Sequence, residues 1–114
     1  MPILITAAGV VESGADPECG VPCTLYVELH LGERMEVTVT VTIESPDRCA
    51  FEVDGLRSAT VQQSLTLDAG TARALIPATF DCSGAKSQED VWLTILASGG
   101  GETAADRIDV EVLC

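Results

Sequence analysis

The chain has 114 residues, enough for one domain, and it is 46% hydrophobic and 21% charged, as expected of a globular protein rather than a disordered tail. Eighteen acidic residues against six basic ones give a net charge of −12, which argues against binding nucleic acid or an anionic membrane, because both need a positive surface. Aromatic residues make up only 4% of the chain, so the core must be built from aliphatic side chains.

Residues 1–23 are predicted to form an N-terminal arm or an edge strand, distinct from the domain that follows. Ile3, Leu4 and Ile5 form a short apolar run of strand-forming residues. One interpretation is an extra edge strand on the chain's own sheet. The other is an assembly arm that adds as a strand to a neighbouring subunit.

Residues 24–114 are predicted to form an all-β domain, because apolar and polar residues alternate along most of this stretch. The run 35–44 is the clearest case, with one apolar face and one face of threonine and glutamate. Pro77 indicates an edge strand or a bulge, since proline has no N–H to donate to the ladder. We expect an antiparallel β-sandwich of seven strands, at 24–31, 35–44, 49–54, 60–68, 71–80, 90–98 and 106–114.

Four of the five cysteines lie in phase with the apolar faces of these strands. If successive strands alternate in direction, Cys23 and Cys49 fall at one end of the sandwich and Cys82 and Cys114 at the other. The sequence therefore predicts the disulfides Cys23–Cys49 and Cys82–Cys114, one closing each end. Cys19 is left as a competitor for the partner of Cys23, a spare thiol, or a thiol for an intermolecular bond. The competing interpretation is that some of these cysteines are simply buried thiols.

Catalytic and metal-binding patterns are weak, and we predict no cofactor and no metal. His30 is the only histidine, which excludes a blue-copper site because that site needs two. The weak metal candidates are His30 with Glu28 and with Glu36, which faces it if the first hairpin loop has three residues. Acidic residues near the predicted loops are weak calcium candidates: Asp16, Glu18, Asp47, Glu52, Asp54, Asp81, Glu89 and Asp90.

The sequence resembles the immunoglobulin-like β-sandwiches of CARDB-type and fibronectin-III-like modules. The resemblance covers about residues 24–113 and rests on Leu31-Gly32-Glu33 followed by 35–43, on the segment 64–70, and on Val91-Trp92-Leu93-Thr94-Ile95. It implies a non-catalytic role in adhesion, spacing or assembly. Residues 1–23 and the cysteine set depart from the usual module.

Three functions are weighed, in order of preference. The first is a non-enzymatic structural or assembly protein of a virion surface or an extracellular filament, whose partners are copies of itself or other subunits. The second is an adhesion or ligand-binding module that uses acidic end loops, with or without calcium, and the third is an enzyme based on a carboxylate pair or His30. Five cysteines favour an oxidising environment, and the opening residues do not read as a secretory signal, which is why a virion setting is included. No apolar run is long enough for a membrane helix, so no membrane insertion is expected.

Overall fold

The structure is a computed structural model that describes residues 3–11, 17–82 and 88–114. It consists of antiparallel strands joined by loops, which confirms the predicted all-β class. The strands are β1 (Ile3–Val10), β2 (Cys23–Leu31), β3 (Met35–Ile43), β4 (Ala50–Val53), β5 (Leu56–Ser58), β6 (Thr60–Leu67), β7 (Gly70–Ala78), β8 (Phe80–Asp81), β9 (Gln88–Gly99) and β10 (Glu102–Leu113).

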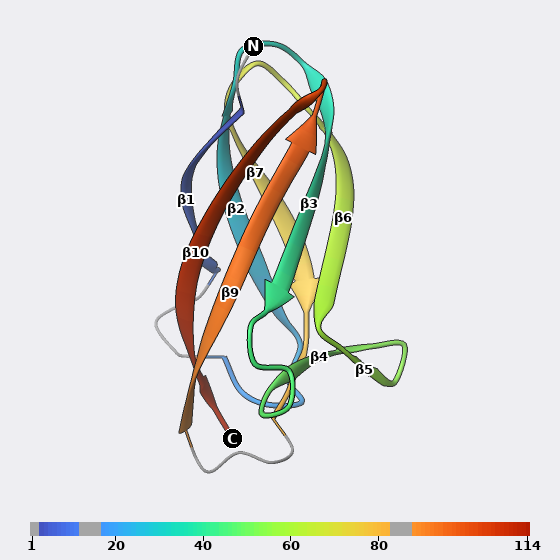
Figure 1. Ribbon diagram of the computed structural model, residues 1–114, viewed down its shortest axis with the longest axis vertical. Coiled ribbons are helices and arrows are strands. Elements are labelled where there is room, and N and C mark those ends of the chain that lie inside the picture. The colour runs from blue at the N-terminus through green and yellow to red at the C-terminus, as the bar shows by residue number, and fades with distance from the viewer. Residues whose placement is uncertain (1–2, 12–16, 83–87) are drawn as a thin grey trace.

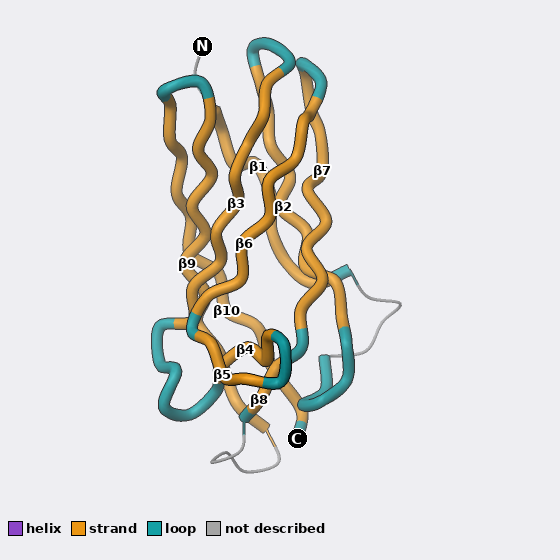
Figure 2. Tube along the Cα trace, turned by 90° about the vertical axis from the view of Figure 1, so that its right-hand side faces the viewer, coloured by secondary structure: helices purple, strands orange, loops and turns teal. Residues whose placement is uncertain are grey.

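Two long sheets pack face to face and form a β-sandwich (Figure 1). One sheet has the strand order β1-β2-β7 and the other has the order β10-β9-β3-β6. At the margins of the sandwich, β1 lies beside β10 and β6 lies beside β7. A third, small sheet with the order β5-β4-β8 lies across the lower end, as Figure 2 shows.

Alternation of apolar and polar residues explains both the strands and the core. In β3, Val37, Val39, Val41 and Ile43 are buried between the sheets, while the threonines between them point outward. The same inward rows come from β2, β7 and β9. Burying aliphatic rows from both sheets supplies the apolar area that the few aromatic residues do not.

The prediction that 49–54 forms the third strand of the sandwich is wrong. Its observed part, β4, pairs with β5 and β8 and lies outside both long sheets. The alternation places Phe51 and Val53 on one inward face, and Phe51 is buried, but Val53 is 39% exposed because the β4–β5 hairpin projects beyond the sandwich (Figure 1). Pro77 does lie in an edge strand, β7, as its missing N–H requires.

The N-terminal segment forms an edge strand of its own chain. The strand β1 pairs with β2 from Ile3 opposite Leu31 to Val10 opposite Leu25, with a register shift between Ile5 and Ala7. Ile3 is buried, Ile5 is half-buried and Leu4 is 52% exposed. Across the part of the chain that the structure describes, there is no helix of the length and apolar character needed to cross a membrane.

Candidate functional site

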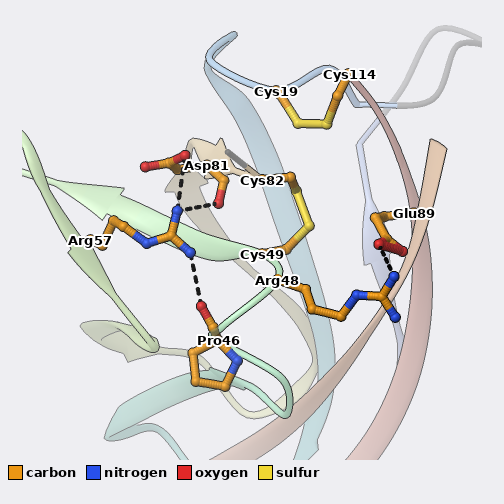
Figure 3. The surroundings of a disulfide bond; sticks show 9 residues. All are labelled: Cys19, Pro46, Arg48, Cys49, Arg57, Asp81, Cys82, Glu89 and Cys114. Atoms are coloured by element: carbon orange, nitrogen blue, oxygen red, sulfur yellow. Dashed lines mark hydrogen bonds and ion pairs between the residues drawn. A yellow bond between two sulfur atoms is a disulfide. The ribbon is translucent and has the colours of Figure 1, made fainter. Parts of the chain in front are cut away.

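Four cysteines from four separate segments meet at the lower end of the sandwich (Figure 3). Cys19 precedes β2, Cys49 precedes β4, Cys82 follows β8, and Cys114 follows β10. Two disulfides join them: Cys19–Cys114, with a Cα–Cα distance of 5.0 Å, and Cys49–Cys82, with a Cα–Cα distance of 4.0 Å. We call these four residues the cysteine cluster.

The predicted disulfide pairs Cys23–Cys49 and Cys82–Cys114 are therefore wrong. The prediction that Cys19 is left over from the intramolecular pairs is also wrong, because it is bonded to Cys114. The error lies in counting 49–54 as a strand that crosses the sandwich. At about 3.3 Å per residue, the four residues of β4 span only about 13 Å and turn back at the lower end. Every later strand then runs opposite to the expected direction, so Cys82 and Cys114 end at the same end as Cys49.

The fifth cysteine, Cys23, takes part in neither disulfide. It is half-buried at the start of β2, where it lies opposite Ala78 of β7. The prediction that Cys23 points toward the core is confirmed, although the residue is only half-buried. The prediction that it forms a disulfide with Cys49 is wrong.

Backbone hydrogen bonds hold the two exposed ends of the cluster in place. The N–H of Cys19 donates to the carbonyl oxygen of Leu113, and the N–H of Leu113 donates to that of Pro17, each over 2.8 Å. The N–H of Gly20 donates to the carbonyl oxygen of Phe80, also over 2.8 Å. The segment before β2 is thus attached to both β10 and β8 independently of any sulfur.

A pair of phenylalanine rings packs the interior of this end. Phe51 of β4 and Phe80 of β8 lie opposite each other in the small sheet, with ring centroids 5.2 Å apart, and both are fully buried. Cys49 and Cys82, which are 2% and 4% exposed, lie in the same core cluster. The inner disulfide is therefore shielded from water, while Cys114 is exposed and Cys19 half-exposed.

Two arginines tie the surrounding loops together, as the dashed lines in Figure 3 show. Arg57 of β5 donates to the carbonyl oxygens of Pro46 and Asp81 over 2.9 and 3.2 Å, and it pairs with the Asp81 carboxylate at 3.1 Å. Arg48 pairs with Glu89 of β9 at 2.8 Å. These contacts fix the loop before Cys49 against β5, β8 and β9.

An open groove of about 400 Å³ lies next to the cluster. Its lining includes Cys19 and Cys82 together with two carboxylates, Glu52 and Asp81. Solvent and small solutes therefore reach Cys19 from this side, whereas Cys82 is only 4% exposed.

The structure does not bring the weak metal candidates together. Glu28 and His30 lie on β2, where His30 is exposed and faces Leu4 and Thr71 across the sheet. Glu36 lies on β3, in the other sheet, and faces Thr66. The chain passes from one sheet to the other between β2 and β3 instead of forming a hairpin, so the predicted opposition of His30 and Glu36 is wrong.

The acidic loops likewise form no carboxylate cluster among the residues described. Asp16 lies outside the described residues. Of the others, Asp81 and Glu89 are engaged by Arg57 and Arg48. Within residues 3–11, 17–82 and 88–114, the group of three or more possible metal ligands with donor atoms in mutual reach is Cys19, Cys82 and Cys114.

One charged cluster stands out on the outer face of the β10-β9-β3-β6 sheet. Arg107 donates to both carboxylate oxygens of Glu44, over 2.6 and 3.0 Å, and its guanidinium lies 3.9 Å from the centre of the Trp92 ring. The Arg107 hydrogen bond lowers the pKa of Glu44, with a further contribution from the Thr94 hydroxyl, against the opposing effect of desolvation. The same hydrogen bond raises the pKa of Arg107. Sequence reasoning missed this contact because the two residues are 63 positions apart.

No protein-family model matches the chain, and a search of curated proteins found no match either.

Proposed function

We propose that the protein is a non-catalytic structural or assembly subunit, a disulfide-stabilised immunoglobulin-like β-sandwich that acts through protein–protein contacts. Its setting is an oxidising one, outside the cell or at a virion surface, because two disulfides are expected to persist there. Its partners are copies of itself or other subunits of the same assembly. The three-plus-four strand arrangement of the two sheets supports the immunoglobulin-like assignment.

The observation that carries this proposal is the uncharged edge strand β6. Its sequence, TVQQSLTL, has no charge and no proline, and it pairs with β3 in a continuous register from Leu67 to Thr60. Soluble proteins normally protect a sheet edge with charges, proline or a bulge. The other edges carry such features: β1 has a register shift, β7 contains Arg73 and Pro77, and β10 has alternating charges.

The side chains of β6 suit a second strand. Val61, Leu65 and Leu67 face the core but are only half-buried, so a partner strand would cover them further. A groove of about 390 Å³ lies at the adjoining margin, lined in part by Val61, Ile76 and Pro77, with Glu52 and Asp54 also in its lining. A strand added beside β6 gains backbone hydrogen bonds and covers the half-buried side chains Val61, Leu65 and Leu67.

The charge of the chain favours the same edge as the contact between copies. Two molecules that each carry −12 repel each other wherever acidic surfaces meet. Most side chains on the outer face next to β6 are hydroxyls and amides that hydrogen-bond across strands, such as Thr38 with Ser64 and Gln62 with Thr40. Glu36 of β3, opposite Thr66, is the charged exception. An antiparallel β6–β6 contact about a twofold axis would join two uncharged strands and continue the four-stranded sheet across both subunits.

The N-terminal strand offers a second route to assembly. The strand β1 is uncharged and lies at the edge of its sheet, and its first residue, Ile3, is buried. Exchange of β1 between two copies would keep every β1–β2 contact and join the subunits, which is the strand-addition role predicted for residues 3–5.

Oligomeric state tests the proposal directly. We expect the wild-type protein to form a dimer or larger assembly in light scattering or sedimentation, and Thr66→Lys to weaken it by at least tenfold in dissociation constant, because lysine at an edge disfavours strand pairing. The matched control is Thr71→Lys, an exposed threonine on the β7 edge, which should leave assembly unchanged. Deletion of residues 1–9 separates the strand-exchange route from the β6 route. A wild-type protein that stays monomeric at high concentration overturns the proposal.

A further inference from the structure

The sulfur atoms of the cysteine cluster lie close enough together to share one metal ion. The Sγ atoms of Cys19, Cys82 and Cys114 are all within 4.8 Å of one another, and the Sγ of Cys49 is bonded to that of Cys82. We propose that, when both disulfides are reduced, Cys19, Cys49, Cys82 and Cys114 bind one Zn²⁺ ion as a tetrathiolate site. This inference is independent of the proposed assembly function.

The sulfur atoms need only short movements after reduction to reach the spacing that zinc requires. A tetrahedral Zn²⁺ with four thiolates at about 2.3 Å places neighbouring sulfur atoms about 3.8 Å apart. The sulfur atoms of Cys19, Cys82 and Cys114 lie within 4.8 Å of one another, and Cys19 and Cys114 can move apart to that spacing once their bond is reduced. Cys49 is bonded to Cys82 but lies outside that group, so after reduction its sulfur must turn toward Cys19 and Cys114, while its strand stays anchored by the Phe51–Phe80 contact.

The chemistry balances with a dithiol as reductant. Each disulfide accepts two electrons and two protons from the dithiol, which is itself oxidised to a disulfide, and two cysteine thiols result. Zn²⁺ then displaces one proton from each of the four thiols and forms four Zn–S bonds. In a reducing medium the metal would thus link the same four segments that the disulfides link in an oxidising one.

The surroundings give the ion a way in. The groove beside the cluster is lined by Cys19 and Cys82, and Cys114 is exposed at the end of β10. The sulfur of Cys23 is outside the group of mutually close ligands. The chain therefore provides its own control cysteine, in the same domain but outside that group.

The test uses the full-length protein reduced with a phosphine under anaerobic conditions and titrated with Co²⁺, then Zn²⁺. We expect intense visible d–d bands of tetrahedral cobalt, a thiolate-to-cobalt charge-transfer band, saturation at one ion per chain, and displacement by Zn²⁺. Cys23→Ser should bind in the same way, whereas Cys114→Ser should lose at least tenfold in affinity. The oxidised protein should show no such spectrum.

Alkylation of the wild-type protein supplies a readout that does not depend on how the variants fold. With Zn²⁺ bound, a thiol reagent should modify Cys23 and spare the other four cysteines, and a chelator should expose all five. The proposal is overturned if reduced wild-type protein gives no tetrahedral cobalt spectrum, or if Cys23→Ser weakens binding as much as Cys114→Ser. Neither result bears on oligomeric state, which is measured on the oxidised protein.

Discussion

The two ends of the sandwich are stabilised in different ways. At the upper end in Figure 1, short turns join β2 to β3, β6 to β7 and β9 to β10, with only two or three residues between the strands. At the lower end, segments distant in sequence meet, and disulfides with sequence separations of 33 and 95 residues join them. Turn residues suffice where neighbouring strands reverse directly. Cross-links and aromatic packing are needed where the chain offers no such local connection.

The largest effect is expected from the aromatic pair at the lower end. Phe80→Ala should lower the free energy of unfolding by about 3–5 kcal/mol, because it removes a fully buried ring and leaves a cavity against Phe51. Urea unfolding with both disulfides intact measures this loss. Leu56→Ala, on the exposed hairpin strand β5, is the control and should change stability by less than about 0.5 kcal/mol. If both variants lower the free energy of unfolding by an equally small amount, the lower end is not packed around the phenylalanines.

Removal of either disulfide should be the next largest effect. In each of two double variants, the free energy of unfolding should fall by about 2–4 kcal/mol. These variants are Cys19→Ala/Cys114→Ala and Cys49→Ala/Cys82→Ala. Cys19 and Cys114 are 95 residues apart in sequence, whereas Cys49 and Cys82 are 33 apart. On the chain-entropy model, loss of the first disulfide should therefore cost about 1 kcal/mol more than loss of the second.

Thermal unfolding compares these double variants with Cys23→Ala. That single variant leaves both bridges intact, so its loss should be smaller than either double variant's. An equal or greater loss for Cys23→Ala would contradict the observed pairing.

At the upper end, a glycine should be the sensitive point. A Cβ at Gly99 would lie 2.5 Å from the backbone oxygen of Glu36, so Gly99→Ala must displace β3 or β9 and should cost about 1–3 kcal/mol. Gly20 at the lower end has a φ of +75° and nothing within 4 Å of the added Cβ, so Gly20→Ala should cost only about 1 kcal/mol of backbone strain. Chemical denaturation of both variants tests the difference, and the reverse order would contradict it.

The smallest effect is expected at the Glu44–Arg107 pair. Because the pKa of Glu44 is lowered in the folded protein, its contribution is fully present above the unfolded-state pKa and is lost as pH falls through the folded pKa. Glu44→Gln should therefore reduce the fall in Tm that acid causes. The change should be small, because the pair is partly exposed to solvent.

Melting curves followed by Trp92 fluorescence at a series of acidic pH values measure this change. Glu102→Gln, at an exposed glutamate next to the β9–β10 turn, is the matched control. The prediction fails if Glu102→Gln changes the fall in Tm at acidic pH as much as Glu44→Gln does.

Much of the fold followed from local pattern. The alternation in 35–44 predicted β3 almost to the residue, and the rows of β2, β7 and β9 were buried on the expected faces. These predictions succeed because a strand's inward face is set by its own sequence, with period two. Pro77 marked an edge strand for the same kind of local reason.

The cysteine cluster could not be predicted in the same way, because a pairing depends on which way each strand runs. One short element, β4, reversed the direction assigned to every strand after it, and both predicted disulfides failed together. The opposition of His30 and Glu36 failed for a related reason, since a three-residue link can join two sheets as well as form a hairpin. The uncharged edge of β6 was visible in the sequence, but its position at an edge was not.

The central claim is that four cysteines meet at one end of the sandwich, and non-reducing peptide mapping by mass spectrometry tests it most directly. After alkylation of thiols and proteolysis of the oxidised protein, we expect linked peptides for Cys19–Cys114 and Cys49–Cys82 and an alkylated Cys23. Linked peptides for Cys23–Cys49 and Cys82–Cys114 would contradict the account.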